Sequence, residues 1–511
     1  MQRKNFLFTA GIFCLLFDYS ISAQAQNTTT QSQNTAAQAQ NSMTALSLTD
    51  TIYNPIVYSL QQCVDSALKN NPTVKTTFFT SETAKINYDQ QRSTMLPSIN
   101  AYGNYLNNGG KSVNPTTYTY INENYNSGYY QAQATLVLWN GFSIQNFIRQ
   151  YALNYQATQM DYQQAKDLMT VNVILAYLTV LSNEEQLTMA KAQAEATRGK
   201  VKLLELENAE GAITPSTLSD MKGQLGTDEL SVVTTQNTLE TNKLALAQFM
   251  NIPYTPNLEF QQLSANNLTP VMYDATVDQI YQNAAQNLAQ VKAANLHLAS
   301  AVKGVKANFG NMLPSLSFYA LAYSNYSTAA TSQSYINTTT VPTKSYVNVN
   351  GGQSFVYSPQ DNYSLPQAIP FGTQFKNDEY YQLGLQLNIP ILQGFRLRTP
   401  YRQAKINLEQ AKFNASTTMI QLKQSVESYY VTMMNAFRTY NTLAQQVKDY
   451  EESFRAAEIR FNAGSVSVLT SLDYLTAKNN IDHATISLIQ AKYNYILQTK
   501  ILDYFQGKLT W

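Results

Sequence analysis

The sequence has little charge and almost no cysteine or histidine. Of its 511 residues, 34 are Lys or Arg and 33 are Asp or Glu, so charged residues make up 13% and the net charge is +1. A near-zero net charge argues against nucleic-acid binding, which needs a basic excess. Two cysteines exclude a disulfide scaffold. Two isolated histidines, without a His/Cys cluster, a Gly-rich phosphate loop or a GxSxG turn, indicate no metal, cofactor or catalytic site, so we do not expect an enzyme.

Long hydrophobic runs are also missing from the body of the chain. No segment after the first residues has about 18 uninterrupted apolar positions, so no transmembrane helix is expected. Residues 1–25 have the basic start, the short apolar stretch and the small-residue cleavage site, after Ala23 or Ala25, of a signal peptide. The protein is therefore expected to be exported. Residues 26–57 are rich in Gln, Asn, Thr and Ala and are predicted to form a flexible arm.

An internal repeat organises the rest of the chain. The segment 95–99 (Met-Leu-Pro-Ser-Ile) returns 217 residues later at 312–316, and Gly141-Phe142 returns 253 residues later as Gly394-Phe395. The larger second offset implies that 36 residues are inserted in the second copy. They must lie between about 320 and 380, where the Tyr/Ser/Asn/Thr/Gly/Pro-rich composition favours a long exposed loop.

Each repeat has the same predicted order, which is helix, β-hairpin, very long helix, turn and helix. The first repeat (58–250) has its hairpin at about 97–139 and its long helix at 143–210. A linker at 251–275 joins it to the second repeat, which has these ranges: 276–511 overall, a hairpin at about 314–390 with a long extracellular loop at 324–379, and a long helix at 399–463.

The long helices have the apolar spacing of coiled coils. From Leu422 to Phe461 the apolar positions recur in alternating steps of four and three, which is a period of 3.5 and indicates left-handed coiled-coil packing. Thr399-Pro400 looks like an N-cap followed by a first helical residue. A helix from there to Phe461 has roughly 60 residues and a length of about 90 Å, which fits a rod or a tube rather than a compact globule.

Four segments alternate between apolar and polar residues, as strands of a membrane β-barrel do. They are 99–105, 130–138, 316–322 and 381–389. A half-buried sheet in a soluble domain would give the same pattern, but four such segments in an exported, Tyr-rich chain favour the barrel. Four strands cannot close a barrel in hydrocarbon, where open edges are not tolerated. The chain must therefore share one barrel with its copies, and a ring of three gives twelve strands while a ring of two gives eight.

With these features, the sequence resembles the TolC-like outer-membrane efflux family. The resemblance covers the chain from about Tyr58 onward. It rests on the opening 60–72 (LQQCVDSALKNNP), the Leu-Pro-Ser strand entries, the Gly-Phe strand exits and the segment 460–464 (Arg-Phe-Asn-Ala-Gly). It implies a mixed α and β membrane protein with two structural repeats. Three chains would share a twelve-stranded transmembrane β-barrel, four strands per chain, continuous with a long coiled-coil helical barrel.

The resemblance also implies a function and partners. The protein would be the outer-membrane exit duct of a tripartite efflux or type I secretion system in a Gram-negative cell, with its helices in the periplasm. A periplasmic adaptor (membrane fusion protein) and an inner-membrane transporter of RND or ABC type would be its partners. Efflux and secretion both fit. A periplasmic coiled-coil adaptor or structural protein without its own pore would share the long helices but lack two pairs of membrane strands. A surface-anchored enzyme would need a cluster of ionisable groups, which the sequence does not show.

Two glycines mark the turns between the long helices and their partners. Gly211 and Gly464 stand where glycine commonly ends a helix, so both turns are expected at the periplasmic tip. An apolar tip that faces water needs a partner, and in the family such turns receive the adaptor; packing between neighbouring helices is the alternative. The candidate docking residues are Ala209, Gly211, Ala212, Ile213, Arg460, Phe461, Ala463, Gly464, Val466 and Leu469.

Acidic residues follow both glycines by nine positions, at Asp220 and Asp473. In a cyclic trimer each inward Asp becomes a ring of three, which favours cations at a constriction. The resemblance implies a second ring six residues after the second glycine, but Thr470 stands there, so only Asp473 matches. Some family members close the entrance with an Arg where this chain has Val466, opposite an acid where it has Thr217. An entrance lock in this chain, where one forms, must therefore use other contacts.

Overall fold

The computed structural model describes residues 56–113, 118–263, 268–463 and 468–508. The signal peptide expected at 1–25 and nearly all of the arm expected at 26–57 lie outside these residues. The described part belongs to one compact unit of the chain.

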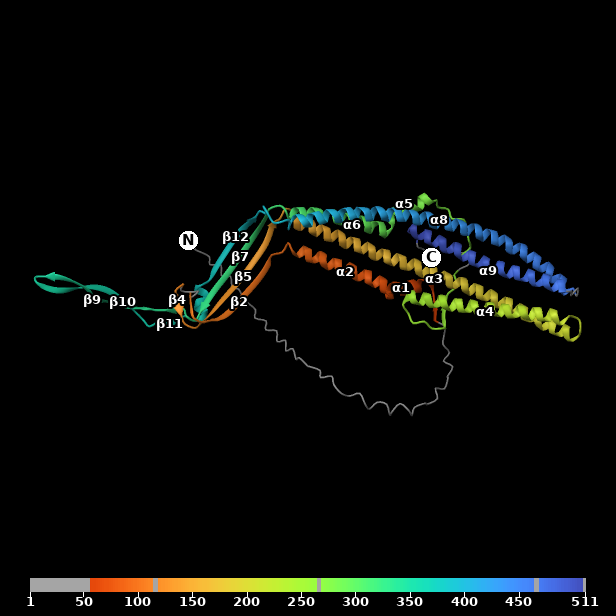
Figure 1. Ribbon diagram of the computed structural model, residues 1–511, viewed down its shortest axis with the longest axis horizontal. Helices are drawn as coiled ribbons and strands as arrows, with labels where there is room; N and C mark the ends of the chain where they lie inside the picture. The colour runs from red at the N-terminus through yellow and green to blue at the C-terminus, as the bar shows by residue number, and fades with distance from the viewer. Residues whose placement is uncertain (1–55, 114–117, 264–267, 464–467, 509–511) are drawn as a thin grey trace, which may run out of the picture. The chain divides into compact units, whose positions relative to one another are not determined.

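Two helical hairpins form the largest part of this unit. In the first, α3 (Ser143–Ala209) is followed by α4 (Pro215–Met250), and in the second, α8 (Arg398–Asn462) is followed by α9 (Val468–Phe505). The 67 residues of α3 correspond to a length of about 100 Å. Each long helix begins and ends within one residue of the range expected from the sequence. Figure 1 shows the two helices of each hairpin running side by side.

Shorter helices precede the sheet strands in each half. They are α1 (Leu60–Asn70) and α2 (Pro72–Ser93) in the first half, and α5 (Val277–Asn287) and α6 (Ala289–Gly310) in the second. Ser59 and Gln62 form a capping box at the start of α1, and Thr276 and Gln279 form the same box at the start of α5. These pairs stand 217 residues apart, so the sequence repeat extends to the hydrogen bonds that begin the helices.

The apolar stripe of α8 packs against neighbouring helices, as its 3.5-residue period predicts. α8 contacts α9, α6 and α5, while α3 contacts α2, α4, α6 and α9. The buried members of the stripe are Leu422, Val426, Met433, Ala436, Ala457 and Phe461. Tyr429, which also belongs to the stripe, remains exposed. The start of α8 differs from expectation: Leu397 is its N-cap without a side-chain bond, and the Thr399 N–H donates to the Phe395 carbonyl at 2.9 Å, so Thr399 already lies inside the helix.

By length and composition, α3 could cross a membrane; it alone among the described helices has so apolar a stretch. Half of that stretch is buried inside the protein. Ile174, Tyr177, Leu178 and Leu181 are almost fully buried in a core that also holds residues of α1, α4 and α9. Core packing therefore accounts for the apolar composition of this helix.

Four long strands form one antiparallel sheet. They are β2 (Ser98–Asn108), β5 (Tyr125–Trp139), β7 (Ser315–Ser327) and β12 (Tyr380–Asn388), and their order across the sheet is β12-β7-β5-β2. Each is one of the four alternating segments of the sequence, which confirms their assignment as strands. β7 of the second repeat pairs with β5 of the first, so a single sheet joins the two repeats (Figure 1).

The inserted segment is not the loop expected at 324–379, because most of it has regular structure. β7 continues to Ser327, β9 (Tyr335–Val349) and β10 (Gly352–Tyr363) form an antiparallel hairpin, and α7 (Phe371–Asn377) follows. Asn350 and Gly351 both have positive φ, at 50° and 82°, as a two-residue hairpin turn requires. The Asn-Gly pair between β-branched and aromatic residues is the sequence signal for this hairpin.

Three short strand pairs complete the described structure. β8 (Thr331–Ser332) pairs with β11 (Gln367–Ala368) at the base of the inserted hairpin. β3 (Lys111–Val113) pairs with β4 (Tyr120–Asn122), between β2 and β5.

The last pair connects the end of the expected arm with the expected linker. β1 (Ile56–Tyr58) runs parallel to β6 (Leu258–Phe260), and the Tyr177 hydroxyl of α3 donates to the Gln261 carbonyl at 2.5 Å. Both connections are therefore anchored to the first repeat.

Candidate functional site

The register of the sheet gathers apolar side chains on one face. Cross-strand partners such as Leu385 and Phe318, or Phe318 and Leu136, lie opposite one another and share that face. The face comprises Ile99, Ala101, Ala132, Ala134, Leu136, Leu316, Phe318, Ala320, Ala322, Tyr381, Leu383, Leu385 and Leu387. Leu383 and Leu385 are each 65% exposed. A continuous apolar surface of this kind marks a binding or membrane surface.

The opposite face of the sheet is mainly polar. It carries Gln131 and Gln133 of β5, together with Gln382 and Gln386 of β12. Three tyrosines lie on it in contact: the ring centroids of Tyr129 and Tyr323 are 5.5 Å apart, and those of Tyr323 and Tyr380 are 4.8 Å apart. One apolar and one polar face is the arrangement of a barrel wall with lipid outside and water inside.

The first turn of the expected tip is built around Gly211. This glycine has φ of +76°, its N–H donates to the Asn208 carbonyl, and the Ala212 N–H donates to the Glu207 carbonyl at 2.8 Å. These two bonds end α3 as a Schellman motif. Thr214 then caps α4 through the Thr217 N–H. The turn is therefore tight, and its backbone groups are satisfied.

A small apolar core supports this turn from inside. It consists of Val201, Leu204, Ile213, Met221, Phe461 and Tyr474. The rings of Phe461 and Tyr474 stack with centroids 4.7 Å apart, and the Lys200 ammonium lies 4.7 Å from the Phe461 centroid. Burial lowers the pKa of Lys200, against the smaller opposing effect of Glu207 and Glu458. The two helical hairpins thus share one core near the tip.

The structure divides the candidate docking residues into three groups. Ala209, Gly211, Ala212, Arg460 and Ala463 are exposed. Ile213 and Phe461 are buried in the tip core, so their side chains stabilise the turn and are not part of the exposed surface. The remaining candidates lie outside the described side chains: Gly464, Val466 and Leu469.

The acidic pore candidates lie on the second helix of each hairpin. Asp220 on α4 and Asp473 on α9 are both exposed in the single chain. Thr470 lies outside the described side chains. Thr217 is buried, and its hydroxyl lies 3.1 Å from the Thr214 hydroxyl.

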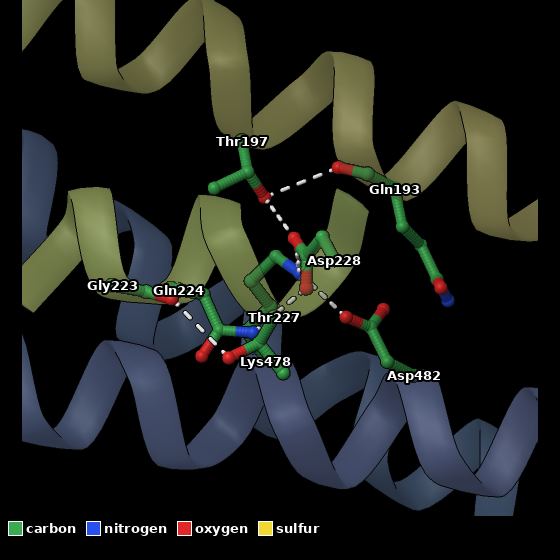
Figure 2. Close-up of polar contacts among 8 residues, drawn as sticks. All are labelled: Gln193, Thr197, Gly223, Gln224, Thr227, Asp228, Lys478 and Asp482. Carbon is green, nitrogen blue, oxygen red and sulfur yellow. Dashed lines mark hydrogen bonds and ion pairs between the residues drawn. The ribbon is translucent and has the colours of Figure 1, made fainter. Parts of the chain in front are cut away.

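A buried charged cluster joins the two hairpins, and the sequence did not predict it (Figure 2). The Lys478 ammonium of α9 lies 3.0 Å from Asp228 Oδ2 of α4 and 2.5 Å from Asp482 Oδ2 of α9. The Thr197 hydroxyl of α3 donates to Asp228 Oδ2 at 2.6 Å, and Gln224 Nε2 donates to Asp228 Oδ1 at 2.8 Å. Three helices therefore meet at one carboxylate.

This cluster is largely shielded from water. The exposed fractions of the side chains are 6% for Lys478, 8% for Asp228 and 20% for Asp482. Burial raises the pKa of Asp482, and Lys478 opposes that rise. The (i, i+4) spacing of Lys478 and Asp482 is visible in the sequence, whereas Asp228 lies 250 residues away from Lys478 and could be found only from the fold.

Within the described ranges, no three His, Cys, Asp or Glu side chains come close enough to hold a metal ion. The candidate site therefore consists of a sheet with one apolar and one polar face, long helices and a compact tip. Such an arrangement can form a barrel wall and a contact surface for a partner.

Comparison with known proteins identifies the family. The sequence profile of the outer membrane efflux protein family matches residues 63–251 and 280–503, which is most of the chain. Outer membrane protein TolC of Salmonella enteritidis is 21% identical over 457 residues, covering 88% of this chain and 82% of that protein. TolC of Escherichia coli (strain K12) is 22% identical over 447 residues, covering 86% and 80%.

Solved structures agree on the fold. The outer membrane protein VceC from Vibrio cholerae superposes with a TM-score of 0.67 at 14% identity, covering 88% of this chain and 96% of that one. The Campylobacter jejuni CmeC outer membrane channel gives a TM-score of 0.65 at 17% identity, covering 88% and 86%. The family match and the two-faced sheet do not favour the alternative of a periplasmic adaptor or structural protein without its own pore. The chain belongs to the outer membrane efflux protein family, and it is an exit duct in the outer membrane with a helical extension into the periplasm.

Proposed function

We propose that three copies of the chain close one barrel of twelve strands, in which β2 of one copy pairs with β12 of the next. The observation that carries this proposal is the pair of open edges. Within the described residues, β2 and β12 each pair with a single neighbour. An unpaired strand edge in hydrocarbon leaves N–H and C=O groups unsatisfied, at a cost of several kcal/mol for each group. A ring of copies removes both edges at once.

The side chains of the polar face favour three copies over two. A barrel of about eight strands has an interior that side chains fill, and this face carries long side chains such as Gln131, Tyr323 and Gln382. Twelve strands enclose a wider lumen, which leaves a path for cargo. Two copies would make an eight-stranded barrel whose lumen is obstructed by its own side chains. The duct in this proposal performs no chemistry of its own.

At the other end, the helical tip receives a periplasmic adaptor, which connects the duct to an inner-membrane transporter of the RND or ABC type. The proposed contact surface is the exposed part of the turns: Ala209, Gly211, Ala212, Arg460 and Ala463, with Gly464, Val466 and Leu469 as further candidates. Small side chains let a partner helix approach the backbone closely. Asp473, with Thr470 beside it and Asp220 on the other hairpin, lines the narrow entrance in this proposal.

Cysteine cross-linking across the open edges tests the barrel. In a Cys63→Ala background, Gln382→Cys on β12 is combined in turn with Asn100→Cys, Tyr102→Cys or Asn104→Cys on β2. One of these combinations is expected to form disulfides between chains, in a ladder that ends at three copies. The matched control combines Gln382→Cys with Gln133→Cys on the central strand β5, and it should not link chains. A ladder that ends at two copies would contradict the twelve strands, and an unlinked monomer at every position would contradict the shared barrel.

A further inference from the structure

The inserted segment of the second repeat is fastened to the sheet by one buried side chain. Gln374 of α7 is 2% exposed. Its Oε1 accepts a hydrogen bond from the Ser327 N–H at 2.8 Å, and its Nε2 donates to the carbonyls of Ser327 at 2.9 Å and Ile369 at 2.7 Å. The Ser324 hydroxyl donates to the Phe375 carbonyl at 2.9 Å. These bonds fix α7 against the end of β7.

Fastened in this way, α7 presents two phenylalanines to the tyrosines of the sheet. The Phe371 ring meets Tyr130 and Tyr326 edge to face, with centroids 5.8 Å and 5.2 Å apart. The Phe375 ring lies 6.1 Å from Tyr130 and 5.8 Å from Phe371. Tyr105 of β2 stacks on Tyr326, with ring centroids 6.4 Å apart. Residues from β2, β5, β7 and α7 thus form one aromatic patch, which we define as Tyr105, Tyr130, Tyr326, Phe371 and Phe375.

Two glycines make room for the centre of this patch. A Cβ built on Gly103 would lie 3.2 Å from Cδ1 of Tyr130, and a Cβ built on Gly128 would lie 2.9 Å from its hydroxyl oxygen. A side chain at either position would push the Tyr130 ring away from the sheet. The two glycines therefore leave space for the Tyr130 ring to lie flat on the sheet, in contact with Phe371 and Phe375.

The aromatic patch lies on the apolar face of the sheet. Tyr130 and Ala132 are two residues apart on β5, and Tyr326 and Ala322 are four apart on β7, so each pair shares a face. Phe371 and Phe375 are nevertheless 47% and 44% exposed. The patch continues the apolar surface toward the end of β7 that is farther from α6 and from the periplasmic helices. Exposed aromatic rings at the rim of an apolar band occupy the boundary between lipid headgroups and acyl chains.

We infer that α7 lies in the headgroup boundary of the outer leaflet and binds lipid through Phe371 and Phe375. This inference rests on the proposed barrel, whose apolar face must meet lipid. Lipid contact at α7 also affects the position of the inserted hairpin β9–β10. The pair of strands β8 and β11 closes the base of the hairpin β9–β10, and β11 ends at Ala368, three residues before α7 begins. Lipid contact at α7 therefore holds the base of this hairpin at the membrane surface.

Tryptophan fluorescence in lipid vesicles tests the inference with the full-length mature protein. Trp139→Phe and Trp511→Phe remove the native tryptophans, and single tryptophans are then introduced as Phe371→Trp or Phe375→Trp. Each protein is reconstituted in phosphatidylcholine vesicles whose acyl chains carry bromine near the glycerol end. Both variants are expected to lose about half of their emission to bromine and to be shielded from aqueous iodide.

Two further positions separate this inference from the barrel proposal. Leu385→Trp lies on the apolar face of β12 and should be quenched by bromine, while Tyr346→Trp on β9 should be quenched by iodide alone. If Leu385→Trp is quenched by bromine but both α7 variants respond only to iodide, the lipid contact of α7 is wrong and the barrel stands. If Leu385→Trp also responds only to iodide, the barrel proposal fails and the α7 inference fails with it.

Discussion

Two carboxylates share the charge of Lys478 in the buried cluster near the tip. Replacement by methionine keeps the length of the side chain but leaves Asp228 and Asp482 close together without a cation. Breaking a buried ion pair by removing one partner costs about 3–5 kcal/mol. We therefore expect Lys478→Met to lower the thermal midpoint of the helices strongly, measured by circular dichroism of the detergent-extracted protein. Asp482→Asn is the matched control. It leaves a single ion pair between Lys478 and Asp228, so it should lower the thermal midpoint much less.

The pH dependence of Lys478→Met has a definite sign. The pKa of Asp482 is raised by burial in the wild type, and it rises further when the cation that opposes this shift is removed. A carboxyl whose pKa is higher in the folded state contributes stability at low pH that is lost as the pH rises through that pKa. The penalty of Lys478→Met should therefore be larger at about pH 8 than at about pH 5. An equal penalty at both pH values would show that lost packing, and not charge, destabilises the variant.

At the scale of elements, the passage from strand to long helix is made by the same dipeptide in both repeats. Gly141 and Phe142 have φ of 64° and 60°, and Gly394 and Phe395 have φ of 51° and 64°. Two consecutive residues with left-handed backbone turn the chain from β5 into α3 in the first repeat, and from β12 into α8 in the second. Phenylalanine adopts this conformation only at a cost, so the surrounding contacts must hold it in place.

Alanine at the two glycines should separate backbone strain from crowding. A Cβ on Gly141 would lie 2.6 Å from the Gly310 carbonyl oxygen, whereas no atom lies within 4 Å of a Cβ on Gly394. Gly394→Ala should cost about 1–2 kcal/mol for the left-handed backbone, and Gly141→Ala should cost clearly more. Thermal unfolding of both variants measures the difference. Equal losses in the free energy of unfolding would mean that Gly310 of α6 moves away from a Cβ on Gly141 without cost.

The elements that sequence reasoning placed correctly are those whose periodicity is long and regular. The 3.5-residue stripe of α8 and the alternation of β12 extend over enough residues for one pattern to dominate. The hairpin β9–β10 was missed because its composition suggested a loop, although the Asn350-Gly351 pair carried a specific turn signal. Strand formation there is favoured by the Thr, Val and Tyr residues on both sides of that turn.

The candidate site was predictable only in part. Glycine at position 211 correctly marked the end of α3, because a left-handed helix end requires it. Exposure was not predictable, since Ile213 and Phe461 stand beside exposed residues in the sequence yet pack inward against Leu204, Met221 and Tyr474. Contacts between the repeats, such as Asp228 with Lys478, depend on how the two hairpins dock and have no local signature.

For the whole molecule, the duplication explains why one chain can serve both ends of a duct. Each repeat supplies two strands of the four-stranded sheet and one long helical hairpin, and β5 and β7 join the repeats within that sheet. The same symmetry places one acid after each turn, at Asp220 and Asp473. In the proposed ring of copies every residue that faces the axis is repeated, so a single carboxylate per chain would be enough to charge the entrance.

Conductance measurements across planar bilayers test whether Asp473 forms that ring. Asp473→Asn removes one charge per chain while it preserves shape, so the permeability ratio of cations to anions should fall by roughly a few-fold at low salt. Raising the salt to about 1 M shortens the screening length to about 3 Å, and the difference from the wild type should then shrink. Asp220→Asn should have a smaller effect, and Asp361→Asn on the hairpin β9–β10 should have none. An unchanged ratio for Asp473→Asn at low salt would place this residue outside the constriction and leave it a solvated helix residue.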